Sequence, residues 1–425
     1  MNQSSESQQL AASTGTLAVI GLGYIGLPTA AMFASNGVNV TGVDISQKAV
    51  DAVNSGTAHI EEGELDELVG RCVGAGLLRA TTSAVAAENF IIAVPTPAGH
   101  DADHSPDVSY VRAAGESIAP VLKKGDLVIL ESTSPVGTTG MLSELFAAAR
   151  PDLRFPHQAG EDADVCIAYC PERIIPGRML QELVENDRII GGMTPRCAAR
   201  ASELYKTFVR GTCHLADDRT AEMVKLTENA FRDVNIAFAN ELSMICADQG
   251  LEAWKVIGFA NRHPRVNILN PGPGVGGHCI AVDPWFIVAT SPQRARLIRA
   301  AREINDAKTE FVVDQVERAM AELPDAKVAC LGLSYKPDVD DFRESPAFEI
   351  AARLSACHGE RVLSTDPYAQ ALSEEAMRNA GLTIVPAEQA IEDAGIIVML
   401  VGHTAFRAFP APEGKRVLDT VGYWR

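Results

Sequence analysis

A glycine-rich turn between two short apolar stretches near the start of the chain constrains the fold more than any other feature. Residues 16–20 predict a buried strand, and the segment Gly21-Leu22-Gly23-Tyr24-Ile25-Gly26 follows directly. An alanine-rich helical stretch comes next, and a second predicted strand, Val38 to Val43, ends at Asp44. A strand, a GxGxxG turn, a helix and a strand that ends in an acid have the order of a dinucleotide-binding βαβ unit. The sequence therefore predicts an α/β domain with a doubly wound, Rossmann-like sheet.

The same residues indicate which dinucleotide binds. Glycines allow a tight turn and let the pyrophosphate approach both the backbone and the helix N-terminus. Asp44 can accept hydrogen bonds from a ribose hydroxyl and would repel a 2′-phosphate, so we expect NAD as the cofactor rather than NADP. The cofactor-binding residues predicted in this unit are Gly21, Gly23, Tyr24, Ile25, Gly26 and Asp44.

Length, charge and cysteine usage limit the remaining possibilities. A chain of 425 residues exceeds a single core, so two or three domains are expected. The formal net charge of −18 argues against nucleic acids and anionic membranes as partners. The nine cysteines show no zinc-site spacing, so we expect no metal, reduced thiols and a cytoplasmic protein. No apolar run is long enough to span a membrane, and the polar residues 1–15 predict a disordered leader.

Further predicted strands end in residues suited to a ligand site. One strand runs into Pro95 and Thr96, and another, Leu127 to Leu130, opens towards Thr133. Ligands bind at the carboxyl ends of strands in open α/β sheets, although an ordinary turn explains Thr133 equally well. A third strand precedes Glu172, which could act as a base or position a water molecule. Considered alone, Glu172 is better explained as a surface residue.

A long helix is predicted next. Residues 212–249 contain neither glycine nor proline, and apolar and small residues recur at helical spacing. We interpret this helix as a spine that links domains and subunits. Lys225 and Asn229 lie four residues apart on one face and could hold a carbonyl or an oxyanion. Considered alone, Lys225 is better explained as a lysine that extends from a partly exposed face to solvent.

Pro271 to Pro284 is the richest stretch in chemical groups. Four glycines crowd into six positions, and Cys279 follows, with Asp283 four residues later. A helix that began near Cys279 would lower the pKa of the thiol and place Asp283 on the same face. This geometry suits a covalent thioester that water then attacks, whereas the alternative is a buried structural cysteine. Just before the loop, residues 261–265 form a small basic cluster that could contact phosphate or could be a solvated turn.

The last hundred residues repeat an α/β pattern. Strands are predicted at 327–331, 361–365, 396–401 and 416–419, and Ser345 is the expected N-cap of a helix that begins with Pro346. The segment has no complete GxGxxG, so we do not assign NAD to it. The predicted domains are a leader at 1–15, an NAD-binding Rossmann domain at 16–211, a helical middle domain at 212–322 that carries the cysteine loop, and a second Rossmann-like domain at 323–425.

Together these motifs resemble the family of NAD-dependent UDP-sugar and GDP-sugar 6-dehydrogenases. The resemblance runs from about residue 16 to the C-terminus. It rests on motifs that occur in the family's order: Gly21 to Gly26, Pro171-Glu172, Lys225 with Asn229, Gly276-Gly277-His278-Cys279 with Asp283, and Lys336-Pro337 with Arg343.

The resemblance implies a reaction and roles for these residues. The family oxidises a sugar C6 alcohol to a carboxylate in two hydride transfers, with two NAD per sugar and no metal. It implies Cys279 as the nucleophile, Lys225 and Asn229 as oxyanion donors, Asp283 with Thr133 in proton transfer, and Glu172 in hydrolysis. Pro95, Thr96, Thr133 and Arg343 would join the NAD site. The implied substrate residues are Glu172, Arg173, Lys225, Asn229, Arg265, Gly276, His278 and Lys336. A homodimer through the long helix is also implied.

Two departures from the UDP-glucose enzymes refine the substrate. Those enzymes usually carry Pro-Lys where this chain has Ala281-Val282, and the segment around Glu172 also differs. Both variants are similar to the N-acetylhexosamine branch, which implies UDP-N-acetylmannosamine as the substrate and a uronic acid for bacterial surface polysaccharides as the product. UDP-N-acetylglucosamine is the close alternative.

Two other functions compete with this one. A single-step β-hydroxyacid dehydrogenase also pairs a GxGxxG domain with a helix that carries lysine and asparagine. It needs neither Cys279 nor residues 325–425. A non-catalytic NAD-binding sensor would leave Cys279, Lys225 and Asp283 without a shared purpose.

Overall fold

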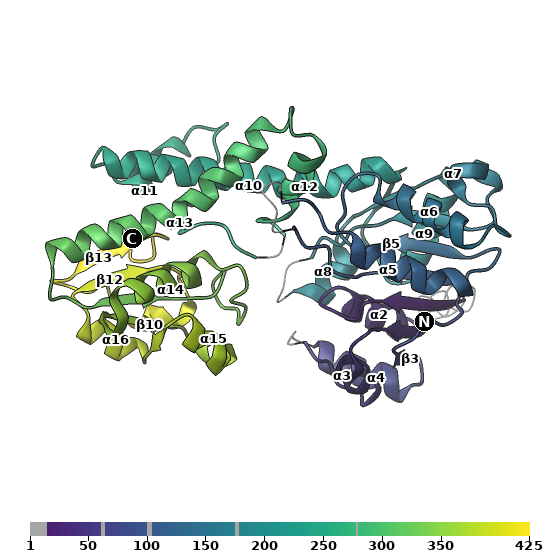
Figure 1. Ribbon diagram of the computed structural model, residues 1–425, viewed down its shortest axis with the longest axis horizontal. Coiled ribbons are helices and arrows are strands. Elements are labelled where there is room, and N and C mark those ends of the chain that lie inside the picture. Colours follow the sequence, from purple (N-terminus) through teal and green to yellow (C-terminus); the bar gives the residue numbers. More distant parts are fainter. Residues whose placement is uncertain (1–14, 61–63, 100–103, 175–177, 278) are drawn as a thin grey trace. The chain divides into compact units, whose positions relative to one another are not determined.

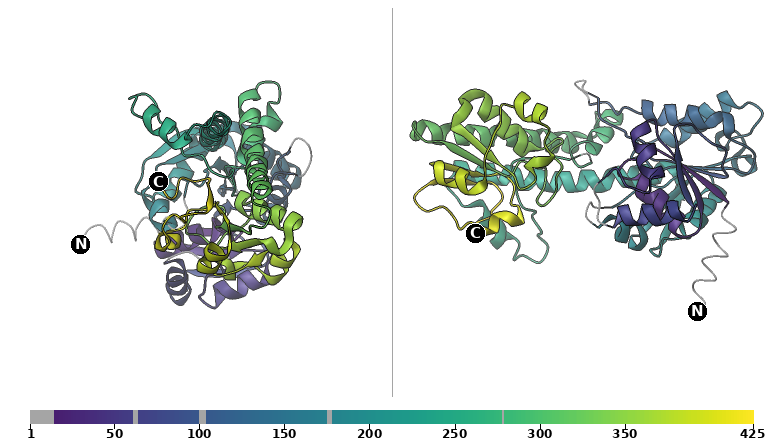
Figure 2. Two further views of the ribbon diagram at one scale, coloured as in Figure 1. Left: turned by 90° about the vertical axis from the view of Figure 1, so that its left-hand side faces the viewer. Right: turned by 90° about the horizontal axis from the view of Figure 1, so that it is seen from below.

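The computed structural model describes residues 15–60, 64–99, 104–174, 178–277 and 279–425. The chain divides into two compact units, 1–227 and 228–425, and the continuous helix α10 (Asp218–Asp248) contains the boundary between them (Figures 1 and 2). The disordered leader predicted for residues 1–15 lies outside the described residues except for Gly15. The expected α/β class with two Rossmann-like sheets is confirmed.

The first unit is built on an eight-stranded sheet with the order β3-β2-β1-β4-β5-β6-β7-β8. Neighbouring strands pair in parallel except for β6 and β7, which are antiparallel. The strands are β1 (Thr16–Ile20), β2 (Asn39–Val43), β3 (Leu78–Thr81), β4 (Asn89–Ile92), β5 (Leu127–Leu130), β6 (Cys166–Tyr169), β7 (Arg188–Gly192) and β8 (Cys213–Asp217). β8 continues this sheet past residue 211, a strand that the sequence pattern did not indicate.

Helices cover both faces of this sheet. One apolar cluster places α2, α4, α8 and α9 against it, and a second places α5 and α6 on the other face. Because both faces are buried, the inner strands β4, β5 and β6 are buried at every position. The helices are α2 (Gly26–Ser35), α3 (Gln47–Asn54), α4 (Leu65–Gly74), α5 (Ser109–Ile118), α6 (Thr138–Ala149), α7 (Pro156–Ala159), α8 (Met179–Glu185) and α9 (Pro195–Tyr205).

The second unit contains a five-stranded parallel sheet with the order β11-β10-β9-β12-β13. Its strands are β9 (Val328–Leu331), β10 (Val362–Thr365), β11 (Thr383–Ile384), β12 (Ile396–Met399) and β13 (Arg416–Asp419). One apolar cluster packs α13 and α14 on one face, and another packs α16 and Phe406 on the other. The helices of this unit are α11 (Ala253–Ala260), α12 (Asp283–Thr290), α13 (Arg296–Glu322), α14 (Pro346–His358), α15 (Glu374–Asn379) and α16 (Ala387–Asp393). Ser345 caps α14, as predicted, by accepting a hydrogen bond from the Phe348 amide.

A buried polar network joins α10 to α13 in the second unit. Arg302 forms an ion pair of 2.7 Å with Asp233, and the Asn305 amide donates to the same carboxylate. Asn240 donates to Asn305 and accepts from the amide of Gly272, the start of the glycine loop. These hydrogen bonds fix the start of the glycine loop against both helices.

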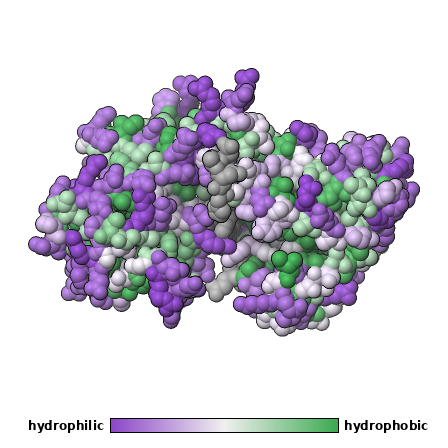
Figure 3. Space-filling view, viewed as in Figure 1, coloured by the Kyte–Doolittle hydropathy of each residue, from purple (hydrophilic) through white to green (hydrophobic). Residues whose placement is uncertain are grey.

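Surface composition agrees with the high charge of the sequence. On the face shown in Figure 3, hydrophilic residues alternate with small hydrophobic areas over both units. Among the described residues, no helix is both long enough and apolar enough to cross a bilayer.

Candidate functional site

The turn after β1 in the first unit and the turn after β9 in the second unit have the same hydrogen-bond pattern. In the first unit, Gly21 has φ 92° and its amide donates to the Val43 carbonyl, while the Leu22 amide donates to Asp44 across 2.8 Å. Gly332 and Leu333 repeat these contacts with Thr365 and Asp366. Both turns lie at the carboxyl ends of strands, where α/β sheets bind ligands.

The first turn fits a dinucleotide. A Cβ on Gly26 would lie 1.8 Å from the Gly21 carbonyl oxygen, so α2 can approach β1 only with glycine there. A Cβ on Gly23 would meet nothing within 4 Å, and this open space suits a pyrophosphate at the N-terminus of α2. Asp44 is half-buried and uses one lone pair on each oxygen for the amides of Leu22 and Ser46. Its remaining lone pairs can accept a ribose hydroxyl.

The second turn differs where the cofactor would need it. Asp366 has no exposed side-chain surface and lies 3.0 Å from the Nε2 atom of His403. It also accepts from the amides of Leu333 and Ser334, so its carboxylate is fully engaged inside the domain. Unlike Asp44, this carboxylate has no exposed oxygen that could accept a ribose hydroxyl.

Three of the cofactor residues predicted beyond the first turn lie on loops after β4 and β5: Pro95, Thr96 and Thr133. The Thr96 hydroxyl donates to the Thr133 carbonyl across 2.6 Å and joins the two loops, with Pro95 next to Thr96 in sequence. Tyr24 is 42% exposed, and Ile25 is the N-cap residue of α2. Arg343 belongs to the second unit and forms an ion pair of 2.7 Å with Asp341.

Lys225 is buried on α10 and only 9% exposed, so it is not the solvent-reaching lysine considered above. Glu222, less than one turn earlier, accepts hydrogen bonds from the Gly137 and Thr139 amides and from the Thr139 hydroxyl. These bonds fix α10 against the N-terminus of α6 and the loop after β5. The first unit therefore combines the helix that carries Lys225 with the loop that carries Thr133.

Cys279 and Asp283 lie at the N-terminus of α12 in the second unit. The helix considered above would begin near Cys279, whereas α12 begins at Asp283, since Pro284 suits the first helical turn and has no amide hydrogen to place. A turn joins the two, with the Asp283 amide donating to the Cys279 carbonyl across 2.8 Å. Cys279 is exposed, whereas Asp283 is 3% exposed and accepts from the Asn229 amide across 2.5 Å.

The glycine loop before Cys279 packs against the second Rossmann-like domain. A Cβ on Gly276 would lie 2.3 Å from the Glu344 carbonyl oxygen, and one on Gly277, where φ is 86°, would lie 3.0 Å from the Tyr335 ring. These two positions therefore need glycine for close backbone approach. His278, a predicted substrate residue, lies outside the described residues.

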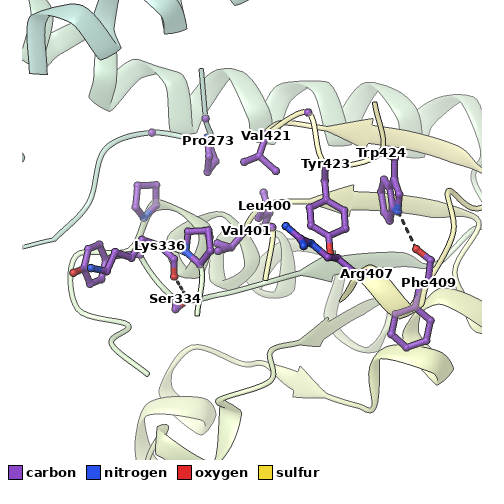
Figure 4. A pocket seen from close by; sticks show the side chains of 18 of the residues that line it. Pro273, Ser334, Lys336, Leu400, Val401, Arg407, Phe409, Val421, Tyr423 and Trp424 are labelled. Carbon is purple, nitrogen blue, oxygen red and sulfur yellow. Dashed lines mark hydrogen bonds between the residues drawn. The ribbon is translucent and has the colours of Figure 1, made fainter. Parts of the chain in front are cut away.

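A pocket of about 690 Å³ opens between this loop and the carboxyl end of the five-stranded sheet. Lys336 lies at one end, and Phe409 and Trp424 lie at the other, where the Trp424 indole donates to the Phe409 carbonyl (Figure 4). Arg407 lies beside Tyr423 within the pocket. We did not predict Arg407, although a basic residue shortly after a strand's carboxyl end was a usable signal. Arg265, a predicted substrate residue, is exposed in the turn after α11 and does not line this pocket.

Glu172 is buried, contrary to its interpretation as a surface residue. Its Oε2 atom lies 3.0 Å from Arg188, and its Oε1 atom accepts the amide of Arg173. Neighbouring Glu131 is also buried and accepts from Tyr205 and Thr29. Sequence analysis missed Arg188 and Glu131, and an acid directly after β5 was the only signal present.

Models of one protein family cover nearly the whole chain. The NAD-binding domain of the UDP-glucose/GDP-mannose dehydrogenase family matches residues 15–209, its central domain matches 219–307, and its UDP-binding domain matches 329–424. The chain belongs to this family. It is an NAD-dependent nucleotide-sugar dehydrogenase, as its first turn and the family's NAD-binding domain both indicate.

Individual relatives agree with the family. A UDP-N-acetyl-D-mannosamine dehydrogenase of Salmonella typhi is 57% identical over 420 residues, which are 96% of this chain and 99% of the relative. An NDP-N-acetyl-D-galactosaminuronic acid dehydrogenase of Ralstonia nicotianae is 56% identical over 411 residues, 96% of each chain. Among solved structures, a UDP-D-ManNAc dehydrogenase from Pyrococcus horikoshii is 38% identical, covers 96% of each chain and has a TM-score of 0.85.

Proposed function

We propose that this enzyme oxidises the C6 hydroxyl of UDP-N-acetyl-D-mannosamine to the carboxylate of UDP-N-acetyl-D-mannosaminuronate through a covalent intermediate on Cys279. The observation that carries the proposal is the turn at the start of α12. There an exposed thiol lies one turn before a buried carboxylate, and that carboxylate is held by an amide from α10. A single-step dehydrogenase has no use for this pairing of nucleophile and carboxylate.

The chemistry follows from the residue types. NAD, when bound, accepts a hydride from C6 in each of the two oxidations. After the first, the Cys279 thiolate attacks the aldehyde carbon, and the carbonyl electrons move to oxygen to give a thiohemiacetal. The thiohemiacetal would then lose its remaining C6 hydrogen as a hydride to a second NAD and its hydroxyl proton to a base, which gives a thioester. Water then attacks the thioester, the thiolate leaves, and the carboxylate is released. The covalent bond keeps the aldehyde from escaping between the steps.

Donors and bases have separate roles in this scheme. Lys225 and Asn229 would stabilise the oxygen of each tetrahedral species. The amide of Asn229 has two hydrogens, and its bond to Asp283 uses one of them. Asp283, with Thr133 and a water molecule, would move the proton of the C6 hydroxyl, and Glu172 would assist hydrolysis.

The pocket in the second unit suits the nucleotide part of the substrate. Lys336 and Arg407 supply positive charge for a diphosphate in a chain that is strongly acidic overall. Phe409, Tyr423 and Trp424 supply aromatic surface against which a base can stack. We therefore propose that UDP binds here, and that the glycine loop at its edge leads the sugar towards Cys279.

We further propose a homodimer through α10. Phe231, Phe238 and Ile245 are 70%, 55% and 45% exposed, and their spacing of two helical turns forms one apolar stripe. A second copy of this helix is the occupant that such a stripe suits. A cytoplasmic location fits the nine cysteines, which form no disulfide in the structure as described. We retain the domain division of 16–211, 212–322 and 323–425 as a proposal.

A second substrate has specific support. The Ralstonia relative is nearly as similar as the Salmonella one, and its name refers to a galactosaminuronic acid. The test is the NADH yield per sugar with limiting UDP-N-acetylmannosamine, UDP-N-acetylglucosamine or UDP-N-acetylgalactosamine. We expect two NADH per sugar with the manno compound alone. Two NADH with another sugar would keep the mechanism and change the substrate, and one NADH per sugar would remove Cys279 from its role.

A further inference from the structure

Three charged side chains meet at the carboxyl ends of β5 and β6 with almost no exposure to solvent. The Nη2 atom of Arg188 lies 3.0 Å from Oε2 of Glu172, and its Nη1 atom lies 3.7 Å from Oε1 of Glu131. The exposed fractions of these side chains are 4%, 6% and 0%. Arg188 also lies over the ring of Tyr205, 4.6 Å from its centroid. One guanidinium therefore holds two carboxylates.

The antiparallel pairing of β6 with β7 produces this arrangement. Ala168 pairs with Gly192, and Tyr169 pairs with Gly191. Continued past the end of β6, the same register places Glu172 opposite Arg188. Because β7 runs against its neighbour, its first residue lies at the edge where β5 and β6 end. Arg188 thereby lies among residues that follow strands, at the ligand-binding edge of the sheet.

Glu131 is the member of the cluster whose charge can change near neutral pH. Burial, and after it the charge of Glu172, raise the pKa of Glu131 to about 7, while Arg188 and the hydrogen bonds from Tyr205 and Thr29 oppose the rise. The Tyr205 hydroxyl lies 2.9 Å from Oε1 of Glu131. The other titratable groups that face the cluster are Cys170, which follows β6, and Tyr205, on α9. Burial raises the pKa of both, so they stay neutral when Glu131 titrates.

We propose that Arg188 is a positioning residue for the hydrolytic step, because it holds the Glu172 carboxylate in place, and that Glu131 opposes this role by competing for the same guanidinium. The inference rests on the proposed function, because it needs the role of Glu172 in hydrolysis. With Glu131 neutral, the guanidinium serves Glu172 alone. With Glu131 ionised, two buried carboxylates share one cation, and the hold on Glu172 weakens.

The matched variant is Glu131→Gln, which keeps the shape of Glu131 but cannot ionise. Its amide oxygen can accept from Tyr205 and its amide nitrogen can donate to the Thr29 hydroxyl, as a protonated Glu131 would. Thioester hydrolysis is measured in single turnovers with NAD and UDP-N-acetylmannosamine, as the decay of the Cys279 adduct seen by intact-protein mass. The ratio of the variant's rate to the wild-type rate cancels every titration that the two proteins share. At pH values below the pKa of Glu131 we expect this ratio to be near one. At pH values above that pKa we expect a ratio on the order of ten, which is the effect of a slightly misplaced catalytic group.

A second variant moves the midpoint of this change. Tyr205→Phe removes the hydroxyl that donates to Glu131 and so raises the pKa of that carboxyl further. We expect the decline in hydrolysis to begin at a higher pH in Tyr205→Phe than in the wild type. Arg188→Met should slow hydrolysis about 100-fold. Arg188→Lys should recover part of that loss, because an ammonium keeps the charge but cannot span both carboxylates.

A purely structural role for Arg188 and Glu131 predicts different results. A ratio for Glu131→Gln that stays constant with pH, in an enzyme that yields two NADH per sugar, would overturn this inference and leave the proposed function intact. Arg188→Met that lowers the melting temperature without slowing hydrolysis would do the same. If the wild-type enzyme makes no NADH with any of the three nucleotide sugars, the proposed function is wrong, and this inference is wrong with it. Glu131→Gln decides the matter even where the Arg188 variants do not fold.

Discussion

The amide nitrogen of Asn229 donates a hydrogen bond of 2.5 Å to Oδ2 of Asp283, joining α10 to the first residue of α12. Asp283 is buried, so this bond both satisfies the carboxylate and fixes its direction. The helix that carries the proposed oxyanion donors therefore also orients the proposed base, and a change at either end should be felt at the other.

Exchanging the two residues separates stability from catalysis. Asn229→Asp alone places two carboxylates together and should destabilise the fold by about 1–3 kcal/mol through a buried carboxylate that loses its donor. Adding Asp283→Asn restores an amide–carboxylate bond with reversed roles, so the melting temperature should recover. NADH formation should not recover, because the carboxylate is now on α10. Full activity in the exchanged protein would show that the position of the carboxylate is unimportant.

Replacing the proposed nucleophile should abolish carboxylate formation while nucleotide-sugar binding persists. The change is Cys279→Ser, since a serine hydroxyl at neutral pH is a far weaker nucleophile than a thiolate. Cys357→Ser is the matched control, because Cys357 is also exposed and lies on α14. Product analysis measures the carboxylate, and calorimetry measures binding. A Cys279→Ser enzyme with wild-type turnover would remove the covalent mechanism.

The glycine loop offers a test of close packing with an internal control. Gly276→Ala would place a methyl group 2.3 Å from the backbone oxygen of Glu344, which cannot move aside as a side chain can. Gly272→Ala would meet its nearest atom, an oxygen of Gly274, only at 3.7 Å. We expect Gly276→Ala to lower the free energy of unfolding by about 1–3 kcal/mol. It should also remove most of the activity, because the loop leads to Cys279. We expect Gly272→Ala to be close to neutral. Equal effects of the two changes on melting temperature and turnover would contradict this packing argument.

The apolar stripe on α10 leads to a prediction about oligomeric state. Phe238→Lys places a charge in the middle of the stripe and should convert a dimer to a monomer, because an unpaired lysine is costly in an apolar interface. Tyr110→Lys is the control, since Tyr110 is 47% exposed on α5 and is not part of the stripe. Analytical ultracentrifugation measures the mass of each protein. A wild-type protein that is monomeric at micromolar concentration would exclude the proposed dimer.

Much of the fold could be predicted because its signals are local. The alternation of buried strands and helices, the GxGxxG turn and the Ser345 cap are written in short stretches, and the structure has β1 and α14 where the sequence indicated them. β8 could not be found this way. It is an exposed edge strand whose burial shows no alternation, so it carries no hydrophobic pattern.

The candidate site was less accessible to sequence reasoning, for reasons of topology. Glu172 seemed to be a surface residue because its partner, Arg188, is distant in sequence and belongs to a strand of opposite direction. Only the antiparallel register brings the two together. The sequence left the start of α12 open. Pro284, which suits a first helical turn, marks it more reliably than the glycines that precede Cys279.

Glu131 should also make the stability of the protein depend on pH. Its pKa is raised in the folded protein from 4.5 to about 7, so the folded state holds a proton that the unfolded chain has released between these values. This bound proton adds about 3 kcal/mol to the free energy of unfolding. The added stability is complete below pH 4.5 and is lost as the pH rises through about 7. Glu131→Gln lacks this titration. Urea titrations at several pH values give the unfolding free energies of wild type and Glu131→Gln. Across this window the wild type should therefore lose stability relative to the variant as the pH rises. A difference independent of pH would mean that Glu131 is already ionised across this window, and its charge would then face Arg188 throughout it.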